Sequence, residues 1–189
     1  MLQQTQVERV KDYFHRFVTK FPSVFDLAEA DEAVVLKYWE GLGYYRRARQ
    51  LHAAAKLIVS DHEGIFPHDA CALRQLPGVG RYTAGAISSI SFDLPEPILE
   101  ANSRRVLARL THYGRPLSGN KDDQPLWDIA AAIVPRDGGA GAFNQALMDL
   151  GSIVCTPVSP CCETCPLAEH CEAYQRGSVD QIPNVPTRK

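Results

Sequence analysis

Five cysteines fall within 17 consecutive residues, and cysteines at this density can hold a metal. Four of them follow the spacing C-x6-C-x2-C-x5-C: Cys155, Cys162, Cys165 and Cys171. Four thiolates on one short loop can hold a [4Fe–4S] cluster or a tetrahedral zinc ion. Zinc ribbons usually carry two separated C-x2-C pairs, whereas one pair with longer arms occurs here. The spacing therefore favours an iron–sulfur cluster, with zinc as the alternative.

Two further cysteines need a separate interpretation. Cys161 adjoins Cys162 and competes with it as a ligand. We prefer Cys162 because it sets the x6 and the x2 spacings at once. Cys71 lies on an expected amphipathic helix, where we predict a buried, small apolar side chain.

The segment Leu76-Pro77-Gly78-Val79-Gly80 separates two expected helices, the second of which begins at Arg81. Its glycines permit positive φ and close backbone approach. Free N–H groups at the start of the second helix can accept a phosphate, and Val79 would fill the bend. This is the composition of a helix-hairpin-helix element, which holds DNA by its backbone without reading sequence. Taken alone, the segment fits an ordinary interhelical turn as well.

These candidate sites are carried by helices, because helical periodicity runs through almost the whole chain. We expect an all-α fold of about nine or ten helices, with a mostly irregular tail beyond Cys171 and a domain boundary near Pro95–Pro97. Asp31, Asp69 and Asn102 are the expected N-caps. The expected helices span residues 3–20, 31–39, 45–60, 69–76, 81–92, 102–112, 125–133 and 141–154.

Composition limits the function classes. The 189 residues are 45% hydrophobic and 22% charged, as in ordinary globular proteins. No apolar run approaches the roughly 20 residues that cross a bilayer, and the polar N-terminus lacks the features of a signal peptide. We expect a cytoplasmic protein, nucleoid-associated in a bacterium, with no membrane partner.

The net charge of −2 gives no overall support for nucleic-acid binding. The arginines are nevertheless clustered, at Arg46, Arg47 and Arg49 and again at Arg104, Arg105 and Arg109. Such clusters form a local basic surface or simply lie on solvated helix faces, and the sequence leaves both readings open.

The ordered motifs resemble a known family. LPGVGRYTAG, then PILEANSRRVLAR, then the four spaced cysteines resemble the helix-hairpin-helix DNA glycosylases that carry an iron–sulfur cluster. Within that group, MLQQTQV, WEGLGYYRRARQLH and FNQALMDLG look like the adenine-DNA glycosylases of the MutY type. The resemblance extends from Met1 to about Cys171.

The resemblance implies two helical lobes: a six-helix barrel with the helix-hairpin-helix element over residues 1–97, and a [4Fe–4S] cluster lobe over residues 98–189. The N-terminal part of the second lobe and a C-terminal domain that reads 8-oxoguanine would lie outside this sequence. The implied partner is double-stranded DNA with an A:8-oxoguanine or A:G mismatch, bound by a monomer. The adenine must leave the base stack, because its glycosidic bond is inaccessible inside a duplex.

The resemblance also assigns DNA contacts. Tyr44 matches a tyrosine that wedges into the duplex beside the damaged guanine, and Leu42 and Gln4 match residues that fill the opened stack. Taken without the motif, Tyr44 reads as a core aromatic at a helix junction. Gln145 matches a position near the edge of the adenine. The hairpin residues Gly78, Val79, Gly80 and Arg81 would hold phosphate.

Adenine excision requires protonation of the leaving base and a negative charge near the cationic sugar. In the family, the acid is a glutamate two residues before the MLQQTQ motif, a position outside this sequence. We interpret this as an internal start or a truncated chain. The second carboxylate is an aspartate in D-G-N; here it is Glu100 in E-A-N, with one more methylene. Asn102 matches the asparagine that hydrogen-bonds this carboxylate.

Tyr82 separates the subfamilies. Endonuclease III-type relatives carry a nucleophilic lysine here, and tyrosine cannot form a Schiff base. The resemblance therefore implies a monofunctional glycosylase, with Tyr82 against the sugar. Two alternatives remain: a mismatch-binding protein that does not cleave, and a thymine- or uracil-removing glycosylase of the same fold.

Overall fold

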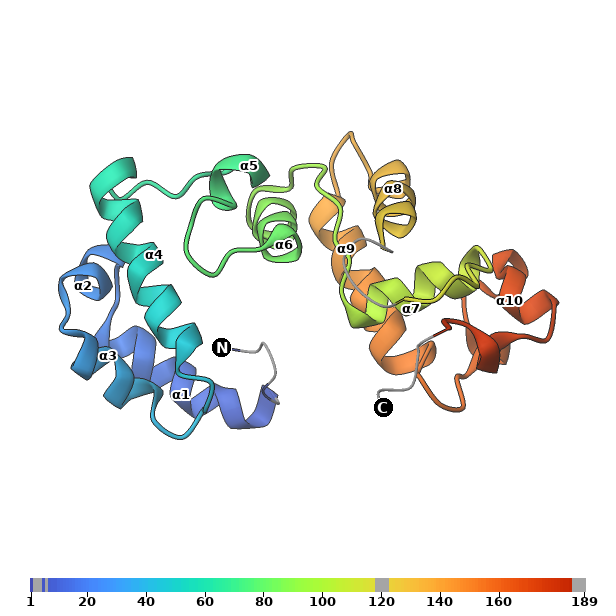
Figure 1. The fold of residues 1–189 in the computed structure, drawn as a ribbon, viewed down its shortest axis with the longest axis horizontal. Coiled ribbons are helices and arrows are strands. Elements are labelled where there is room, and N and C mark those ends of the chain that lie inside the picture. The colour runs from blue at the N-terminus through green and yellow to red at the C-terminus, as the bar shows by residue number, and fades with distance from the viewer. Residues whose placement is uncertain (2–4, 6, 118–122, 185–189) are drawn as a thin grey trace. The chain divides into compact units, whose positions relative to one another are not determined.

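The computed structural model describes residues 1, 5, 7–117 and 123–184, and every regular element in these ranges is helical. The predicted all-α fold is confirmed for this part of the chain. The chain divides into two compact units, Met1–Gly80 and Arg81–Lys189 (Figure 1). Each unit has its own apolar core.

The first unit is built around one long helix, α4. Its helices are α1 (Val7–Lys20), α2 (Val24–Glu29), α3 (Glu32–Trp39), α4 (Arg46–His62) and α5 (Ala70–Leu73). Helices α2 and α3 contact α4, and α1 contacts α3. Trp39 lies at the centre of the core with its ring edge-on to Phe17, at 6.1 Å between centroids.

The sequence analysis missed α2, although it has a local start signal. Ser23 is the N-cap, its hydroxyl accepts from the backbone N–H of Asp26, and the Asp26 side chain accepts from the backbone N–H of Ser23. This reciprocal pair is a capping box. Of the other expected caps, Asp69 accepts from the N–H of Ala72 at 2.8 Å, whereas Asp31 occupies the N-cap position without a side-chain bond.

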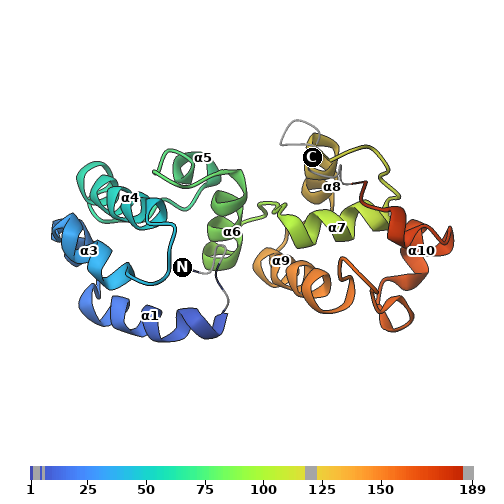
Figure 2. The same cartoon turned by 60° about the horizontal axis from the view of Figure 1, so that its bottom comes forward.

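The second unit carries α6 (Arg81–Phe92), α7 (Ala101–Leu110), α8 (Gln124–Ile133), α9 (Ala140–Asp149) and α10 (Glu172–Gln175). A π-helical turn, Leu150–Val154, continues α9 to Cys155. Short 3₁₀ turns follow at Cys162–Thr164, Ala168–His170 and Val179–Gln181. Helix α7 contacts α8, α9 and α10 (Figure 2). In the described part of the tail beyond Cys171, α10 and the turn Val179–Gln181 are helical and the other residues are irregular.

The boundary between the units differs from the one expected near Pro95–Pro97. It falls one helix earlier, after Gly80, because α6 packs against α9. Gly141 makes this contact close, since a Cβ at that position would lie 2.6 Å from the carbonyl oxygen of Ser89. The buried Asn144 adds a hydrogen bond to the Ser89 hydroxyl at 2.8 Å.

Asp93 joins the end of α6 to the start of α9. Its carboxylate accepts from the backbone N–H groups of Gly139 at 2.8 Å and Gly141 at 3.0 Å. These bonds, with the bond from Gly141 contributing most, lower the pKa of Asp93. The carboxylate therefore stabilises the folded state above the ordinary aspartate pKa of about 3.9, and this stabilisation is lost as the pH falls through the lower folded-state pKa.

We therefore expect Asp93→Asn to lower the melting temperature at pH 7, because the anionic acceptor at the start of α9 is removed. The difference from the unchanged protein should disappear when the pH falls below the folded-state pKa. Asp137→Asn is the control, since Asp137 is exposed and close in sequence to the start of α9. Equal melting temperatures for all three proteins at pH 7 would contradict the assigned cap.

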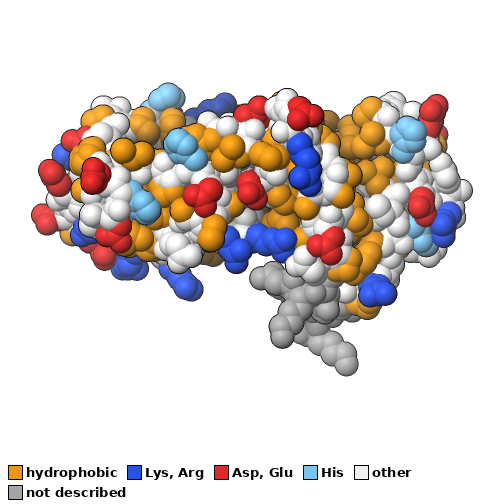
Figure 3. All heavy atoms as spheres, turned by 90° about the horizontal axis from the view of Figure 1, so that it is seen from above, with side chains coloured by type: hydrophobic (Ala, Val, Ile, Leu, Met, Phe, Trp, Pro, Cys, Tyr) orange, Lys and Arg blue, Asp and Glu red, His pale blue; other side chains and the backbone are white. Residues whose placement is uncertain are grey.

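Within the described residues, no helix is long and apolar enough to cross a membrane. On the face shown in Figure 3, acidic and basic side chains are interspersed with apolar ones. Any DNA contact must therefore depend on local groups instead of on overall charge.

Candidate functional site

Glu100 is fixed at the start of α7. One of its carboxylate oxygens, Oε1, accepts from the backbone N–H groups of Asn102 and Ser103, each at 2.8 Å. In return, the Ser103 hydroxyl accepts from the backbone N–H of Glu100 at 2.8 Å. Glu100 is thus the N-cap of α7, and the expected cap at Asn102 is wrong by two residues. Asn102 does bond this carboxylate, but through its backbone.

Tyr82, on the first turn of α6, is close enough to be affected by the charge of this carboxylate. Burial raises the pKa of the Tyr82 phenol, and the negative charge of Glu100 raises it further. The hydroxyl itself points to the sulfur of Met148 on α9, at 3.5 Å. The second unit therefore brings together Tyr82, Glu100 and Asn102, three residues that the sequence predicted as one group.

Arg105 connects this group to the segment that carries the four spaced cysteines, residues 155–171, here called the cysteine loop. Its guanidinium donates to the side-chain oxygen of Asn102 at 3.0 Å and to the carbonyl oxygens of Gly151 at 2.6 Å and Cys155 at 2.7 Å. Only 8% of Arg105 is exposed, and burial lowers its pKa. Arg105 is therefore neither part of a basic surface nor on a solvated face. It holds the start of α7 against the residues that precede the cysteines.

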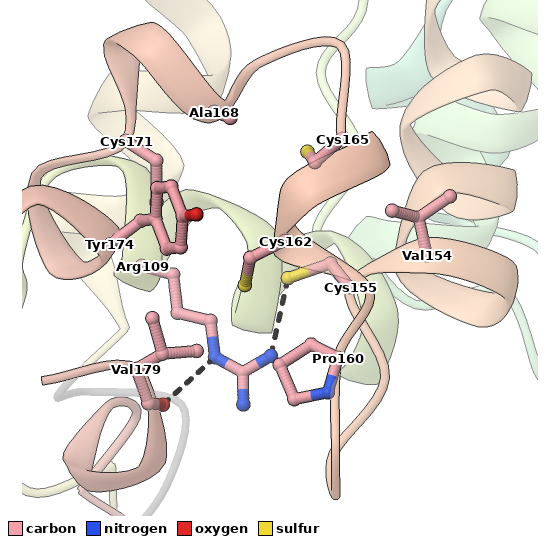
Figure 4. A pocket seen from close by; sticks show the side chains of 10 residues that line it. All are labelled: Arg109, Val154, Cys155, Pro160, Cys162, Cys165, Ala168, Cys171, Tyr174 and Val179. Carbon is pink, nitrogen blue, oxygen red and sulfur yellow. Dashed lines mark hydrogen bonds between the residues drawn. The ribbon is translucent and has the colours of Figure 1, made fainter. Parts of the chain in front are cut away.

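Arg109, one turn further along α7, occupies the same kind of position at the cysteine loop. It donates to the sulfur of Cys155 at 3.3 Å and to the carbonyl oxygen of Thr156 at 2.8 Å. Its Nε also donates to the carbonyl oxygen of Val179 at 3.2 Å (Figure 4). The same Nε donates to the carbonyl oxygen of Ile182 at 2.9 Å. The sequence analysis grouped Arg105 and Arg109 with exposed arginines. Their i, i+4 spacing on a helix rich in apolar residues was the available signal for burial.

Four cysteines line one cavity beneath α7: Cys155, Cys162, Cys165 and Cys171 (Figure 4). Val154, Pro160, Ala168, Tyr174, Val179 and Arg109 complete its wall. Burial raises the pKa of the Cys162 thiol, and the charge of Cys155 adds to this effect. Within the described ranges, no three His, Cys, Asp or Glu side chains form a group that could hold a single metal ion.

The chemistry of this cavity fits an iron–sulfur cluster. Its four sulfur donors are of the type that ligates such clusters, and its other walls are mostly apolar. The Arg109 guanidinium donates to the sulfur of Cys155, one of these four donors, and hydrogen bonds of this kind tune the potentials of iron–sulfur clusters.

The remaining two cysteines lie elsewhere. Cys161 is exposed and does not line the cavity that Cys162 shares with the other three. Cys71, on α5, is also exposed, so the prediction of a buried side chain is wrong. Helix α5 has only four residues, and it buries Leu73 instead.

In the first unit, the residues expected to enter DNA differ in exposure. Tyr44 is 64% exposed and has a φ of 49°, so it is not a core aromatic. The guanidinium of Arg47 lies 5.5 Å from its ring and 5.4 Å from the ring of Trp39. Leu42 is instead buried in the core at 6% exposure. Gln4 lies outside the described residues.

The hairpin forms a tight turn, in which the N–H of Val79 donates to the carbonyl oxygen of Leu76 at 3.1 Å. Gly78 has a φ of 81°, and a Cβ there would lie 2.8 Å from the Cβ of Gln50. A side chain at Gly78 would therefore clash and be strained, whereas a Cβ at Gly80 would meet nothing within 4 Å. Val79 is half-buried.

Arg81 begins α6, but its side chain is engaged within the second unit. The guanidinium lies 4.0 Å from the ring centre of Trp127 and donates to Gln124 at 3.0 Å. The phosphate contact expected of Arg81 stays a prediction. Gln145, expected near the adenine, is an exposed residue of α9.

Residues 1–124 match the family described as HhH-GPD superfamily base excision DNA repair protein. The chain belongs to this superfamily. Its similarity to adenine DNA glycosylases covers nearly the whole chain: it is 44% identical to the Mus musculus protein over 189 residues, 44% to the Homo sapiens protein over 183, and 41% to one from Buchnera aphidicola subsp. Schizaphis graminum over 183.

The chain covers 36%, 33% and 52% of those three relatives, so it spans about a third to a half of their length. Among solved structures, a thermostable thymine-DNA glycosylase matches with a TM-score of 0.82 and 30% identity, over 93% of this chain and 80% of that one. A non-covalent endonuclease III–DNA complex matches with a TM-score of 0.76 at 23% identity, over 92% and 79%. The HhH-GPD fold predicted from the motifs is confirmed.

Proposed function

We propose that this HhH-GPD chain is the core of a monomeric, monofunctional DNA glycosylase that hydrolyses the N-glycosidic bond of adenine mispaired with 8-oxoguanine or guanine. The observation that carries the proposal is the carboxylate of Glu100, held by two backbone N–H groups beside Tyr82. A fixed negative charge at that position would stabilise the cationic sugar as the base departs.

Water completes the reaction because Tyr82 offers no amine. A hydrolytic glycosylase breaks the base–sugar bond, and the hydroxyl of water takes the place of the base. Within residues 81–117 and 123–184, no lysine is present to attack the sugar. The product would therefore be an abasic site in an unbroken strand. We also propose that the protein acts in the cytoplasm, or at the nucleoid in a bacterium.

We also propose that Cys155, Cys162, Cys165 and Cys171 ligate a [4Fe–4S] cluster. When bound, the cluster would brace residues 155–171 by joining their sulfurs. Arg105 and Arg109 would then transmit this order to α7, because both bond the backbone of this loop and lie on the helix that Glu100 caps.

A single-turnover excision assay tests the activity. The chain and a version extended upstream are each mixed in excess with duplexes containing A:8-oxoguanine, A:G, T:G or U:G, and strand cleavage is measured with and without hot alkali. We expect adenine excision from the extended version, with breakage only after alkali. Breakage without alkali would overturn the monofunctional assignment.

Two alternatives are kept. The 30% identity to a thymine-DNA glycosylase favours a thymine- or uracil-removing enzyme, which the T:G and U:G duplexes would reveal. The second alternative is a protein that binds mismatches without cleaving them. Tight, mismatch-selective binding without excision by either version would establish that second alternative.

Tyr44 is the aromatic side chain most available for the duplex. Because stacking of a base on an aromatic ring contributes about 1–3 kcal/mol, we expect Tyr44→Ser to raise the Kd for a mismatched duplex roughly 5- to 150-fold. Fluorescence anisotropy at fixed salt measures the change. Tyr45→Ser, at the less exposed neighbouring tyrosine, is the control. Equal effects of the two substitutions would argue against a specific role of Tyr44.

A further inference from the structure

The capping box of α7 has its two side chains exchanged. In the usual box, a short residue is the N-cap and a glutamate or glutamine stands three residues later. Here Glu100 is the N-cap and Ser103 is the third residue. The box of α2 begins instead with a short residue, Ser23. The exchange falls at the one helix whose N-cap is also the candidate catalytic carboxylate.

A glutamate is a poor N-cap, because short side chains reach the first backbone N–H groups directly. The longer chain must fold back, and ordering it costs rotamer entropy. The folded-back form is nevertheless present, since Oε1 lies 2.8 Å from both N–H donors. The Ser103 hydroxyl, with no exposed surface, bonds the backbone N–H of Glu100 and so fixes the residue from which this side chain starts.

The exchanged box leaves the other carboxylate oxygen available. In the described part of the chain, Oε2 of Glu100 accepts no hydrogen bond. Tyr82 is near enough for the Glu100 charge to raise its pKa, yet its hydroxyl points to Met148. Among the described residues, the hydrogen bonds that hold the carboxylate are therefore those of the helix cap, and the charge of Arg105 attracts it as well.

We propose that Ser103 is a positioning residue that makes the longer Glu100 usable as the carboxylate of base excision. By fixing the Glu100 backbone, Ser103 keeps Oε1 on the start of α7 and Oε2 free to face the cationic sugar. Because the Glu100 side chain folds back onto the start of α7, its extra methylene does not move the carboxylate away from the position that a shorter aspartate would occupy. This inference rests on the proposed function, because it concerns the carboxylate of that reaction.

The test is a double-mutant cycle in the complete natural protein with its cofactor. Because a displacement of about 1 Å can cost on the order of 10²-fold, we expect Ser103→Ala to lower the single-turnover excision rate about 10- to 100-fold, with duplex Kd changed less than about twofold. In a Glu100→Asp background, the same substitution should cost less than about threefold, because aspartate is itself a good cap.

Ser89→Ala is the matched control, since it also removes a fully buried hydroxyl with two hydrogen bonds from the same unit. It should lower stability but leave the rate within about threefold of the unchanged protein. Equal losses for Ser103→Ala in the glutamate and aspartate backgrounds would overturn the inference, as would a rate loss matched by Ser89→Ala.

A crystal structure of the Ser103→Ala protein gives a readout that needs no activity. We expect the Glu100 carboxylate to have left the backbone N–H groups of positions 102 and 103, so that the start of α7 no longer holds it. If the unchanged protein excises no base, the proposed function fails, and this structure alone decides the positioning role. A carboxylate that keeps both bonds in the variant overturns it.

Discussion

Replacing Cys162 with alanine is expected to remove most of the iron from the purified protein, together with the absorbance at about 400 nm. Cys162 lines the cavity with three other cysteines, and a cluster deprived of one ligand is exposed to loss. Since metal binding and folding are coupled, the second unit should also become more sensitive to protease. Iron and sulfide analysis, with limited proteolysis, measures both effects.

Cys161→Ala is the matched control, because it removes the adjacent thiol, which is exposed and outside the cavity. It should leave iron content and absorbance unchanged, as should Cys71→Ala in the first unit. If Cys161→Ala lost the iron while Cys162→Ala kept it, the ligand assignment would be wrong. Zinc in place of iron in the unchanged protein would refute the cluster itself.

Replacing Glu100 with glutamine should lower the single-turnover excision rate about 10²- to 10³-fold, because the negative charge opposite the developing cation is lost. The glutamine oxygen can still accept from the N–H groups of Asn102 and Ser103, so α7 should remain capped. Duplex affinity should therefore hardly change. This separation of rate from affinity distinguishes an electrostatic role from a structural one.

Glu96→Gln is the control for this substitution. Glu96 precedes α7 by a few residues, is half-buried, and uses its backbone oxygen to bind Asn144. Removal of its charge should leave the excision rate within about threefold. Loss of duplex binding by Glu100→Gln, or an unchanged excision rate, would show that this carboxylate does not stabilise the transition state.

Local patterns predicted the helices that carry the site. The periodicity of residues 81–92 and 45–60 matches α6 and α4 to within two residues, because an amphipathic stripe is written directly in the sequence. The spacing of the cysteines favoured Cys162 over its neighbour Cys161. The four cysteines chosen in this way line one cavity, and Cys161 does not. Features that depend on residues close together in the sequence could thus be predicted from the sequence alone.

Tertiary contacts decided what local patterns misjudged. Arg105 and Arg109 look like a solvated charge cluster, yet carbonyl oxygens some 46 to 73 residues away accept their hydrogen bonds and permit their burial. Likewise, α6 belongs with α9 because Gly141 and Asn144 meet Ser89. Such partners are distant in sequence, and no local pattern identifies them.

The sequence by itself predicted the all-α class, the hairpin and the set of sulfur donors, because each depends on residue types at short spacing. The carboxylate at position 100 was predicted from the resemblance to a family. Only the tertiary structure decided that Glu100 and not Asn102 caps α7, that Leu42 is buried while Tyr44 is exposed, and that two arginines join the helix to the cysteine loop. The physical reason is that burial and hydrogen bonding of polar groups depend on distant partners, which the folded chain alone brings together.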